Sequence, residues 1–266
     1  MTKIVLITGA SSGLGHGMGK YLAEKGYRVY GTSRKALPAQ GKVKMVTMDV
    51  NESESIRSAI AKIKEEAGGI DVLINNAGLG LAGVIEHLQM NDLEKVFQTN
   101  VFGLLRTCQE VLPLMREQRS GLIINISSIG SEMGLPYRGG YSASKAAVDR
   151  ITEAMRMEVK QFGIKACIVQ PGDIKSNINA NRVTSPVPTG SPYKEKFDIA
   201  HKGMNEGVSG GMDPLLFGPV IEKIIKSKNP KVYYRIGKPT EKLSILVKRI
   251  LPGKQFEKIL MKHFDL

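Results

Sequence analysis

Residues 3–15 read KIVLITGASSGLG, a short apolar run followed by a glycine-rich turn. The run Ile4–Ile7 has the length and the unbroken hydrophobicity of a strand that is buried on both faces. After the turn, a helical pattern extends from Gly13 to about residue 25. A strand, a glycine-rich turn and a helix in this order predict the first β-α unit of a parallel α/β sheet.

The same alternation of strands and helices continues through the chain. Further strands are predicted at 28–32, 43–47, 71–74, 122–126, 165–170 and 231–235, and helices at 52–67, 91–118, 141–162 and 213–227. Continuous apolar strands separated by helices are typical of a parallel sheet that is covered on both faces. The sequence therefore predicts an α/β fold: one Rossmann-type domain over residues 1–266, with a doubly wound parallel sheet.

Two segments depart from this alternation. Residues 173–213 are rich in Pro, Gly, Asn and Ser and show little periodicity, so we expect a substrate loop or lid there. Residues 239–266 predict a basic helical C-terminal extension, in which apolar residues such as Leu243, Leu246 and Ile250 recur at helical spacing. Packing on the protein's own core is one interpretation of this extension, and contact with an anionic membrane surface is the other.

Composition and charge exclude several classes of protein. The chain is 42% hydrophobic and 24% charged, as globular domains are. Cys108 and Cys167 lie in apolar segments without motif spacing, which predicts neither a disulfide framework nor a metal site. No uncharged apolar stretch is long enough to span a bilayer, and no charged leader precedes the first strand, so we expect a cytoplasmic protein. The net charge of +13 is concentrated at 222–266, where 12 basic and 4 acidic residues give +8. Because the chain has no Trp and no element that would read a groove, we expect no nucleic-acid partner.

The glycine-rich turn has the properties of a dinucleotide site. Glycines after the first strand permit a tight turn and let the backbone approach a pyrophosphate, which the N-terminus of the following helix attracts. The next strand ends at Thr32-Ser33-Arg34, without the acid that binds the ribose 2′-hydroxyl in NAD sites. Ser33 and Arg34 are suited to a 2′-phosphate, although Arg34 can equally be a solvated loop residue. We therefore expect NADP(H) to be preferred, with NAD(H) as the alternative.

A tyrosine and a lysine four residues apart form the candidate catalytic pair. Tyr141 and Lys145 lie at the start of the predicted helix 141–162, where positions i and i+4 share one face. A cation beside a phenol stabilises the phenolate, which suits general acid–base chemistry. An isolated pair of this kind is weak as a signal, since such pairs occur on helices by chance.

Taken together, these motifs resemble the classical short-chain dehydrogenase/reductase family. The resemblance covers about residues 3–176 and rests on the Gly-x-x-x-Gly-x-Gly turn at 9–15, Asn75-Asn76-Ala77-Gly78, Tyr141-x-x-x-Lys145 and Pro171-Gly172, in family order. It implies that Asn100, Ser128, Tyr141 and Lys145 are catalytic, with Ser127 as the competing serine. The cofactor contacts implied by the turn and the resemblance are Gly9, Ser11, Ser12, Gly13, Leu14, Gly15, Ser33, Arg34, Asp49, Val50, Asn76, Ala77, Gly78, Tyr141, Lys145, Pro171, Gly172 and Ile174.

The resemblance also implies a reaction and an assembly. We expect an NADP(H)-dependent oxidoreductase that transfers hydride between the nicotinamide and a carbonyl or alcohol, acting as a homodimer or homotetramer. Ser176 stands where many members have a threonine that contacts the nicotinamide amide. The extended end is similar to hydroxysteroid and retinol dehydrogenase-like members, which implies a lipophilic substrate: a steroid, a retinoid or a long-chain ketone.

Substrate choice is expected to depend on the variable segments. Met133, Leu135 and Tyr137 suggest an apolar pocket wall, although core packing accounts equally well for any one of them. Met204 and Met212 suit an adaptable lid. Two other functions remain open at this stage. One is a cofactor-binding sensor that keeps the fold without the chemistry. The other is a peripheral membrane protein that uses the basic extension.

Overall fold

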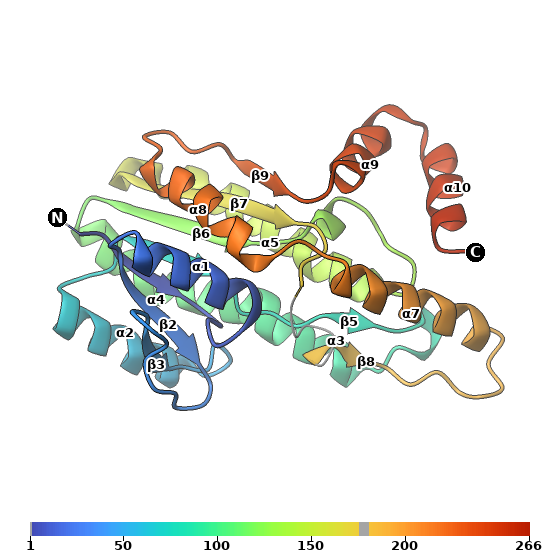
Figure 1. Ribbon diagram of the computed structural model, residues 1–266, viewed down its shortest axis with the longest axis horizontal. Helices are drawn as coiled ribbons and strands as arrows, with labels where there is room; N and C mark the ends of the chain where they lie inside the picture. Colours follow the sequence, from blue (N-terminus) through green and yellow to red (C-terminus); the bar gives the residue numbers. More distant parts are fainter. Residues whose placement is uncertain (1, 176–180) are drawn as a thin grey trace.

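Seven parallel strands form the central sheet of the computed structural model, which describes residues 2–175 and 181–266 (Figure 1). Their order across the sheet is β3-β2-β1-β4-β6-β7-β9. The order reverses between β1 and β4, which are direct neighbours, and such a reversal opens a crevice at the carboxyl ends of the strands. The strands are β1 (Ile4–Ile7), β2 (Arg28–Ser33), β3 (Lys44–Thr47), β4 (Val72–Asn75), β6 (Gly121–Ile126), β7 (Ile164–Pro171) and β9 (Tyr233–Ile236).

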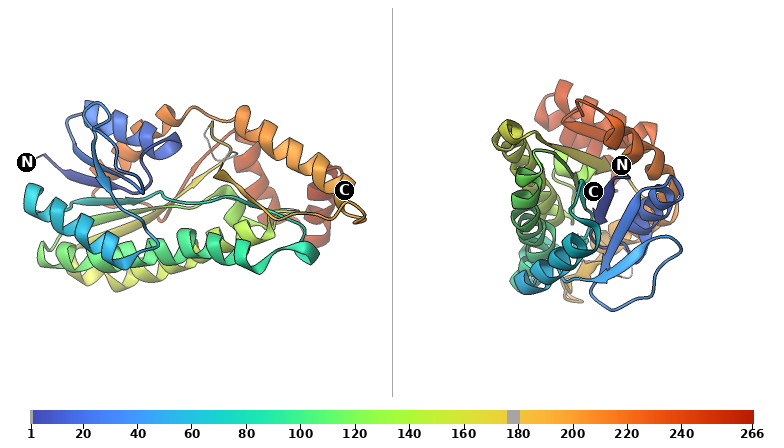
Figure 2. Two further views of the ribbon diagram at one scale, coloured as in Figure 1. Left: turned by 90° about the horizontal axis from the view of Figure 1, so that it is seen from below. Right: turned by 90° about the vertical axis from the view of Figure 1, so that its left-hand side faces the viewer.

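Helices cover both faces of this sheet, as the views in Figure 2 show. Alternate residues of a strand point to opposite faces. Val5 and Ile7 accordingly pack in one core with α1 (Gly13–Glu24) and α8 (Phe217–Lys226). Leu6 packs in the other core, beneath α2 (Ser53–Ala67), α4 (Leu104–Glu117) and α5 (Gly139–Glu158). The predicted doubly wound α/β domain is confirmed.

The predicted helix 91–118 is divided into three parts. It consists of α3 (Met90–Phe97), a π-helical turn (Gln98–Gly103) and α4. Gly103 ends the π-helical turn against the β3–α2 connection, where an added Cβ would lie 2.9 Å from the carbonyl oxygen of Val50. A π-helical turn inside a helix often marks a functional position, because it redirects side chains that a regular helix would point elsewhere.

The prediction of an irregular loop over 173–213 was wrong in part. It contains β8 (Val183–Thr184), paired in parallel with β5 (Leu81–Ala82), and the 16-residue helix α7 (Lys194–Ser209). Phe197, Ala200, Met204 and Val208 form the buried stripe of α7. The glycines and polar residues of this segment have low helix propensity and hid that stripe in the sequence. Met204 therefore belongs to a small core with Ala82 and Val84.

The C-terminal extension consists of α9 (Pro239–Ile250) and α10 (Gly253–His263), which project beyond the edge strand β9 (Figure 1). Ile245 and Phe256 are buried against Ile129 and Met133. Of the two interpretations of Met133, pocket wall or core packing, this cluster favours core packing. Among the described helices, none combines the length and the hydrophobicity needed to cross a bilayer. Short 3-10 turns complete the fold at Ile85–His87, Ile129–Glu132 (η3), Lys160–Phe162 and Pro214–Leu216 (η5).

Candidate active site

The glycine-rich turn is tied to the end of β4. Thr8 Oγ1 accepts hydrogen bonds from the backbone N–H groups of Asn76 and Ala77, both at 2.9 Å. In return, Asn76 Nδ2 donates to the carbonyl oxygens of Thr8 (2.9 Å) and Gly9 (3.0 Å). These bonds hold the turn of β1 and the Asn-Asn-Ala-Gly segment together as one wall of the crevice.

Glycine is required at two positions of this turn. Gly9 has φ +65°, and an added Cβ there would lie 3.0 Å from Ala77 Cα. A Cβ at Gly15 would lie 2.5 Å from both the Gly9 carbonyl oxygen and Asn76 Nδ2. Ser12, the N-cap of α1, makes no side-chain capping bond, so its side chain occupies none of the N–H groups of the first turn, where Gly13 and Leu14 line the crevice. This arrangement can receive a pyrophosphate.

A cleft of about 780 Å³ runs along the carboxyl ends of the strands, beside the turn. It is lined by seventeen of the predicted cofactor residues and by both candidate serines: Gly9, Ser11, Ser12, Gly13, Leu14, Ser33, Arg34, Asp49, Val50, Asn76, Ala77, Gly78, Ser127, Ser128, Tyr141, Lys145, Pro171, Gly172 and Ile174. Gly15 lies beneath the turn, where it permits the close packing just described, and does not line the cleft. Ser176 lies outside the described residues.

The end of the cleft near β2 is basic. Arg34 and Lys35 are exposed and line it, and Ser33 Oγ accepts a hydrogen bond from Lys35 N at 3.2 Å. Asp49 is the acid at this end, and its Oδ1 accepts a bond from Asn51 N at 2.9 Å. The sequence interpretation missed Lys35, although its place directly after Arg34 was a signal for it.

Tyr141 and Lys145 both point into the cleft from α5. Tyr141 is 7% exposed and Lys145 is 6% exposed. Lys145 Nζ donates to the carbonyl oxygen of Ile126 at 2.9 Å, which holds the ammonium against the end of β6. The Arg138 guanidinium lies 5.1 Å from the centroid of the Tyr141 ring. The Tyr141 ring is therefore buried beside the Arg138 guanidinium, and the Lys145 ammonium lines the same cleft.

Asn100 reaches the same place from the π-helical turn. An added Cβ at Gly78 would lie 3.1 Å from Asn100 Oδ1 and 3.5 Å from Lys145 Nζ. The amide and the ammonium therefore converge on Gly78. Asn100 Nδ2 also donates to Ser144 Oγ at 3.1 Å, which connects the turn to α5. Asn100 does not line the cleft surface, but it lies directly behind it.

The two candidate serines differ in their hydrogen bonds. Ser127 is 3% exposed, and its hydroxyl donates to the carbonyl oxygen of Lys145 at 3.2 Å. Ser128 Oγ accepts a bond from Gly130 N at 3.0 Å. An accepted bond uses a lone pair, so the Ser128 hydrogen is available to a ligand while the Ser127 hydrogen is engaged.

Comparison with known proteins adds to this geometry. A family model described as "short chain dehydrogenase" matches residues 3–186. The chain belongs to the short-chain dehydrogenase family. This short-chain dehydrogenase is 43% identical over 257 residues to 3-ketodihydrosphingosine reductase of Bacteroides thetaiotaomicron, with 96% of this chain and 95% of that protein covered. It is 35% identical over 259 residues to dehydrogenase/reductase SDR family member 7B of Mus musculus, with 88% and 79% covered. The chain is therefore an oxidoreductase.

Solved structures agree with the fold of this short-chain dehydrogenase. A short-chain dehydrogenase of Streptomyces avermitilis superposes with a TM-score of 0.83 at 28% identity, with 99% of this chain and 96% of that chain covered. ElxO, solved with NADP bound, has a TM-score of 0.73 at 26% identity, with 89% and 96% covered. A Burkholderia phymatum protein in complex with NAD has a TM-score of 0.80 at 21% identity, with 93% of each chain covered, and shows the fold alone.

Proposed function

We propose that this short-chain dehydrogenase uses NADPH to reduce a ketone on a long aliphatic chain to the corresponding alcohol. The observation that supports the proposal most strongly is that Ser128, Tyr141 and Lys145 line the same cleft as the glycine-rich turn, with Asn100 directly behind Gly78. A nucleotide-binding sensor has no need for four polar groups in this arrangement.

The cleft fits a nicotinamide dinucleotide. The positions of Gly9 and Gly15 leave no room for a Cβ, and the first turn of α1 presents its N–H groups, as a pyrophosphate requires. Ser33, Arg34 and Lys35 lie at the end of the cleft near β2, and residues 32–35 contain no acidic side chain. This composition favours NADP(H) over NAD(H). Asp49 and Val50 border the adenine end, and Asn76 to Gly78 form the middle of the wall.

The side chains at the other end have separate roles in the reaction. A bound NADPH supplies the hydride that reduces the carbonyl carbon. Ser128 donates its hydroxyl hydrogen to the carbonyl oxygen and so orients the ketone. Tyr141 gives its phenolic proton to that oxygen as the alcohol forms. Lys145 would hold the nicotinamide ribose of the bound cofactor and, with Asn100 and a water, would return a proton to Tyr141. Alcohol oxidation is the same sequence in reverse.

The long-chain ketone is the first choice of substrate among lipophilic carbonyls. Its support is the 43% identity to a protein named 3-ketodihydrosphingosine reductase, over nearly the whole of both chains. A steroid or a retinoid remains the alternative within the same chemical class. All three carry a carbonyl group on a largely apolar skeleton.

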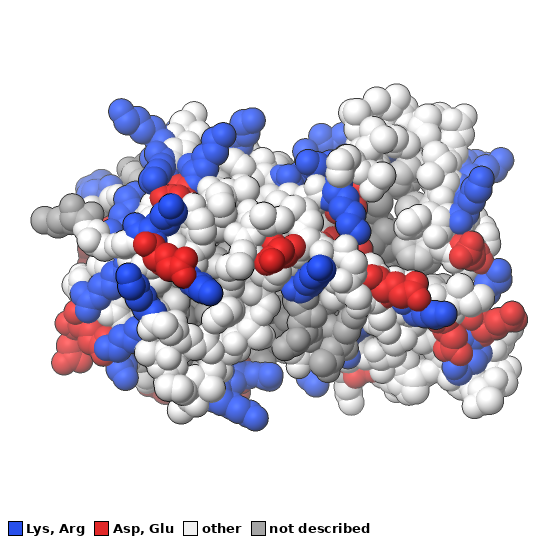
Figure 3. Space-filling model, viewed as in Figure 1, with Lys and Arg blue, Asp and Glu red and all other residues white. Residues whose placement is uncertain are grey.

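The partners follow from the surface. We infer a cytoplasmic protein that forms a homodimer or homotetramer; the exposed Phe102 beside α4 and the exposed Met157 on α5 support the oligomer alone. The C-terminal extension is suited to an anionic membrane surface, because Leu246 (53% exposed) and Ile250 (70% exposed) lie among basic residues. Figure 3 shows basic side chains at the outer edge of the molecule over α10. Such contact would bring the enzyme to a lipid substrate.

The test is NADPH oxidation, with NADH in parallel, against 3-ketodihydrosphingosine, a ketosteroid, retinal and a short-chain ketone. We expect turnover with NADPH, and a kcat/KM for the long-chain ketone at least about tenfold above that of the short one. Tight NADPH binding without turnover of any of these carbonyls would replace the enzyme with a cofactor sensor. Equal use of NADH would overturn the cofactor preference.

A further inference from the structure

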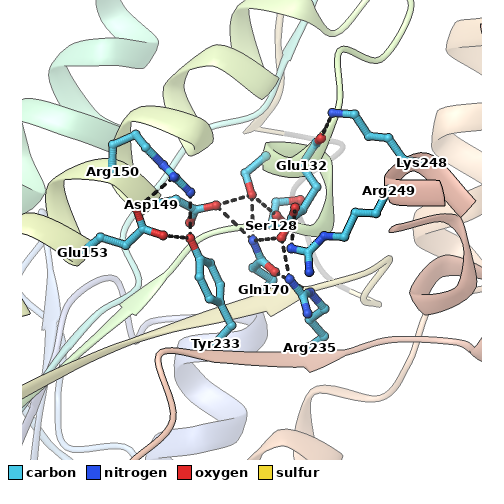
Figure 4. A network of polar contacts seen from close by, with 11 residues as sticks. Ser128, Glu132, Asp149, Arg150, Glu153, Gln170, Tyr233, Arg235, Lys248 and Arg249 are labelled. Atoms are coloured by element: carbon cyan, nitrogen blue, oxygen red, sulfur yellow. Dashed lines mark hydrogen bonds and ion pairs between the residues drawn. The ribbon is translucent and has the colours of Figure 1, made fainter. Parts of the chain in front are cut away.

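A buried polar network lies beneath the loop that carries Ser128 (Figure 4). Its centre consists of Ser131 from η3, Asp149 from α5 and Gln170 from β7. Asp149 is 2% exposed and Gln170 is fully buried. Gln170 Nε2 lies within hydrogen-bond distance of Ser131 Oγ (3.0 Å) and Asp149 Oδ2 (2.9 Å). The mechanism above assigns no role to these residues.

The hydroxyl of Ser131 has more partners than it has hydrogens. Ser131 Oγ lies 2.7 Å from the Ser128 carbonyl oxygen, which can only accept. It also lies 2.5 Å from Asp149 Oδ2. The hydroxyl has one hydrogen, so it cannot donate to both oxygens. If that hydrogen goes to Ser128, the short contact with Asp149 requires a proton on the carboxyl group.

The surroundings of Asp149 favour this proton. Burial raises the pKa of the Asp149 carboxyl above its ordinary value, and the neighbouring polar side chains of Ser131 and Gln170 only partly oppose that rise. Asp149 Oδ1 is buried without a hydrogen-bond partner among the described residues. An unpaired oxygen is far less costly on a neutral acid than on a carboxylate.

Resting on the proposed function, we propose that Asp149 is a positioning residue that acts in its protonated form. Its Oδ2–H donates to Ser131 Oγ, and Ser131 then donates to the carbonyl oxygen of Ser128. Together with the bond from Ser131 N to the same oxygen (3.0 Å), this fixes the backbone from which the Ser128 hydroxyl points into the cleft.

Ionisation of Asp149 has a defined consequence. As the pH rises through its raised pKa, the Ser131 hydrogen turns to the carboxylate and the Ser128 carbonyl loses that bond. The same shift links the group to folding: the folded state holds this proton more tightly than the unfolded chain, so the contribution to stability falls as the pH rises from about 3.8 through the folded pKa.

Several charged and titratable groups face this site. Arg235 Nη2 pairs with Glu132 Oε1 at 2.7 Å, and Arg249 and Lys248 of α9 also contact Glu132. Burial raises the pKa of Glu132, but the hydrogen bonds from Arg235 and Gln170 outweigh that effect, and the net pKa is lowered. Glu132 therefore stays ionised and opposes a second negative charge beside it. The groups around Asp149 are Glu132 from η3, Tyr233 and Arg235 from β9, Arg150 and Glu153 from α5, and Lys248 and Arg249 from α9 (Figure 4).

Two substitutions of similar size separate the possibilities. Asp149→Asn supplies an N–H that can donate to Ser131 at every pH, whereas Asp149→Leu supplies no donor. We expect Asp149→Leu to lower kcat about tenfold with little change in the Kd of NADPH. Asp149→Asn should retain at least about a third of the kcat and lose one ionisation from the pH profile. Ser131→Ala, which removes the same bond by another route, should resemble Asp149→Leu.

The matched control is Glu153→Gln, one turn along α5. Glu153 accepts from Tyr233 (2.5 Å) and pairs with Arg150 (2.9 Å), without contact to Ser131. This variant should keep the wild-type pH profile. A carboxylic acid C=O band in the infrared spectrum that disappears in Asp149→Asn would report the proton directly, without turnover.

Each outcome of these experiments decides one part of the proposal. Wild-type kcat and pH profile in Asp149→Leu and Ser131→Ala would overturn the positioning role. Asp149→Asn as impaired as Asp149→Leu, or a wild type without the carboxylic acid band, would overturn the protonated form. If the wild type reduces no carbonyl at all, the proposed function fails instead, and the infrared result still decides the state of Asp149.

Discussion

Asn100 and Leu79 exchange two hydrogen bonds behind the cleft. The Leu79 N–H donates to Asn100 Oδ1 at 2.7 Å, and Asn100 Nδ2 donates to the Leu79 carbonyl oxygen at 2.9 Å. The side chain of Asn100 is 1% exposed, so these bonds are shielded from water. The loop that follows β4 is thus fixed to the π-helical turn through a single amide.

Replacement of Asn100 by Ala is therefore expected to affect both stability and rate. Two buried backbone groups of Leu79 lose their partners, which lowers the free energy of unfolding by about 2 kcal/mol, and kcat falls as the proton return is lost. Urea unfolding and steady-state kinetics measure these effects. Gln98→Ala is the control: Gln98 is exposed on the same turn and bonds Arg106 (3.0 Å), so it should change neither. An Asn100→Ala variant as stable as the wild type would contradict the account.

Arg34 is expected to determine the cofactor preference. Loss of a charge-assisted bond to a 2′-phosphate should reduce kcat/KM for NADPH by about 10- to 100-fold in Arg34→Ala, while kcat/KM for NADH changes little. The comparison requires both cofactors at one carbonyl concentration. Lys62→Ala, an exposed change on α2 away from the cleft, controls for net charge. An equal loss with both cofactors would rule out a specific contact of Arg34 with the phosphate.

Gly15 offers a steric test of the glycine-rich turn. In Gly15→Ala the new Cβ meets the Gly9 carbonyl oxygen and Asn76 Nδ2 at 2.5 Å, so the turn must shift. We expect a loss of roughly 2 kcal/mol in stability and a weaker Kd for NADPH. Gly203→Ala is the matched control, since nothing lies within 4 Å of its Cβ position on α7. It should stabilise the fold by about 1 kcal/mol. Thermal unfolding and NADPH fluorescence titration report both values.

The sequence predicted the sheet and the two core layers well, because the parallel strands are continuous apolar runs with no competing pattern. It also located the polar residues after β4 and β6, since these directly follow such runs. It missed α7, whose buried stripe is interrupted by Gly203 and Gly207. The network around Asp149 was equally hidden. Ser131, Asp149 and Gln170 are about 20 residues apart in sequence, and tertiary packing alone brings them together.

The C-terminal extension should bind anionic vesicles. The double substitution Leu246→Ser and Ile250→Ser removes exposed apolar area from α9. It changes neither the net charge nor the packing residue Ile245, which is buried. We expect this double variant to bind phosphatidylcholine vesicles containing phosphatidylglycerol several-fold less than the wild type, and wild-type binding to weaken with salt. Leu215→Ser with Leu216→Ser, two residues that are also exposed but lie in η5, should have no effect. Binding that is the same in all variants would exclude α9 as the contact.

Hydride transfer itself is tested most directly with NADPH that carries deuterium on the transferable position of the nicotinamide. We predict that the wild type places one deuterium on the former carbonyl carbon of a long-chain ketone. Tyr141→Phe should bind NADPH with nearly the same Kd and form that product at least about 100-fold more slowly. Product without deuterium, or equal rates in the two enzymes, would contradict the assignment of this cleft and of Tyr141.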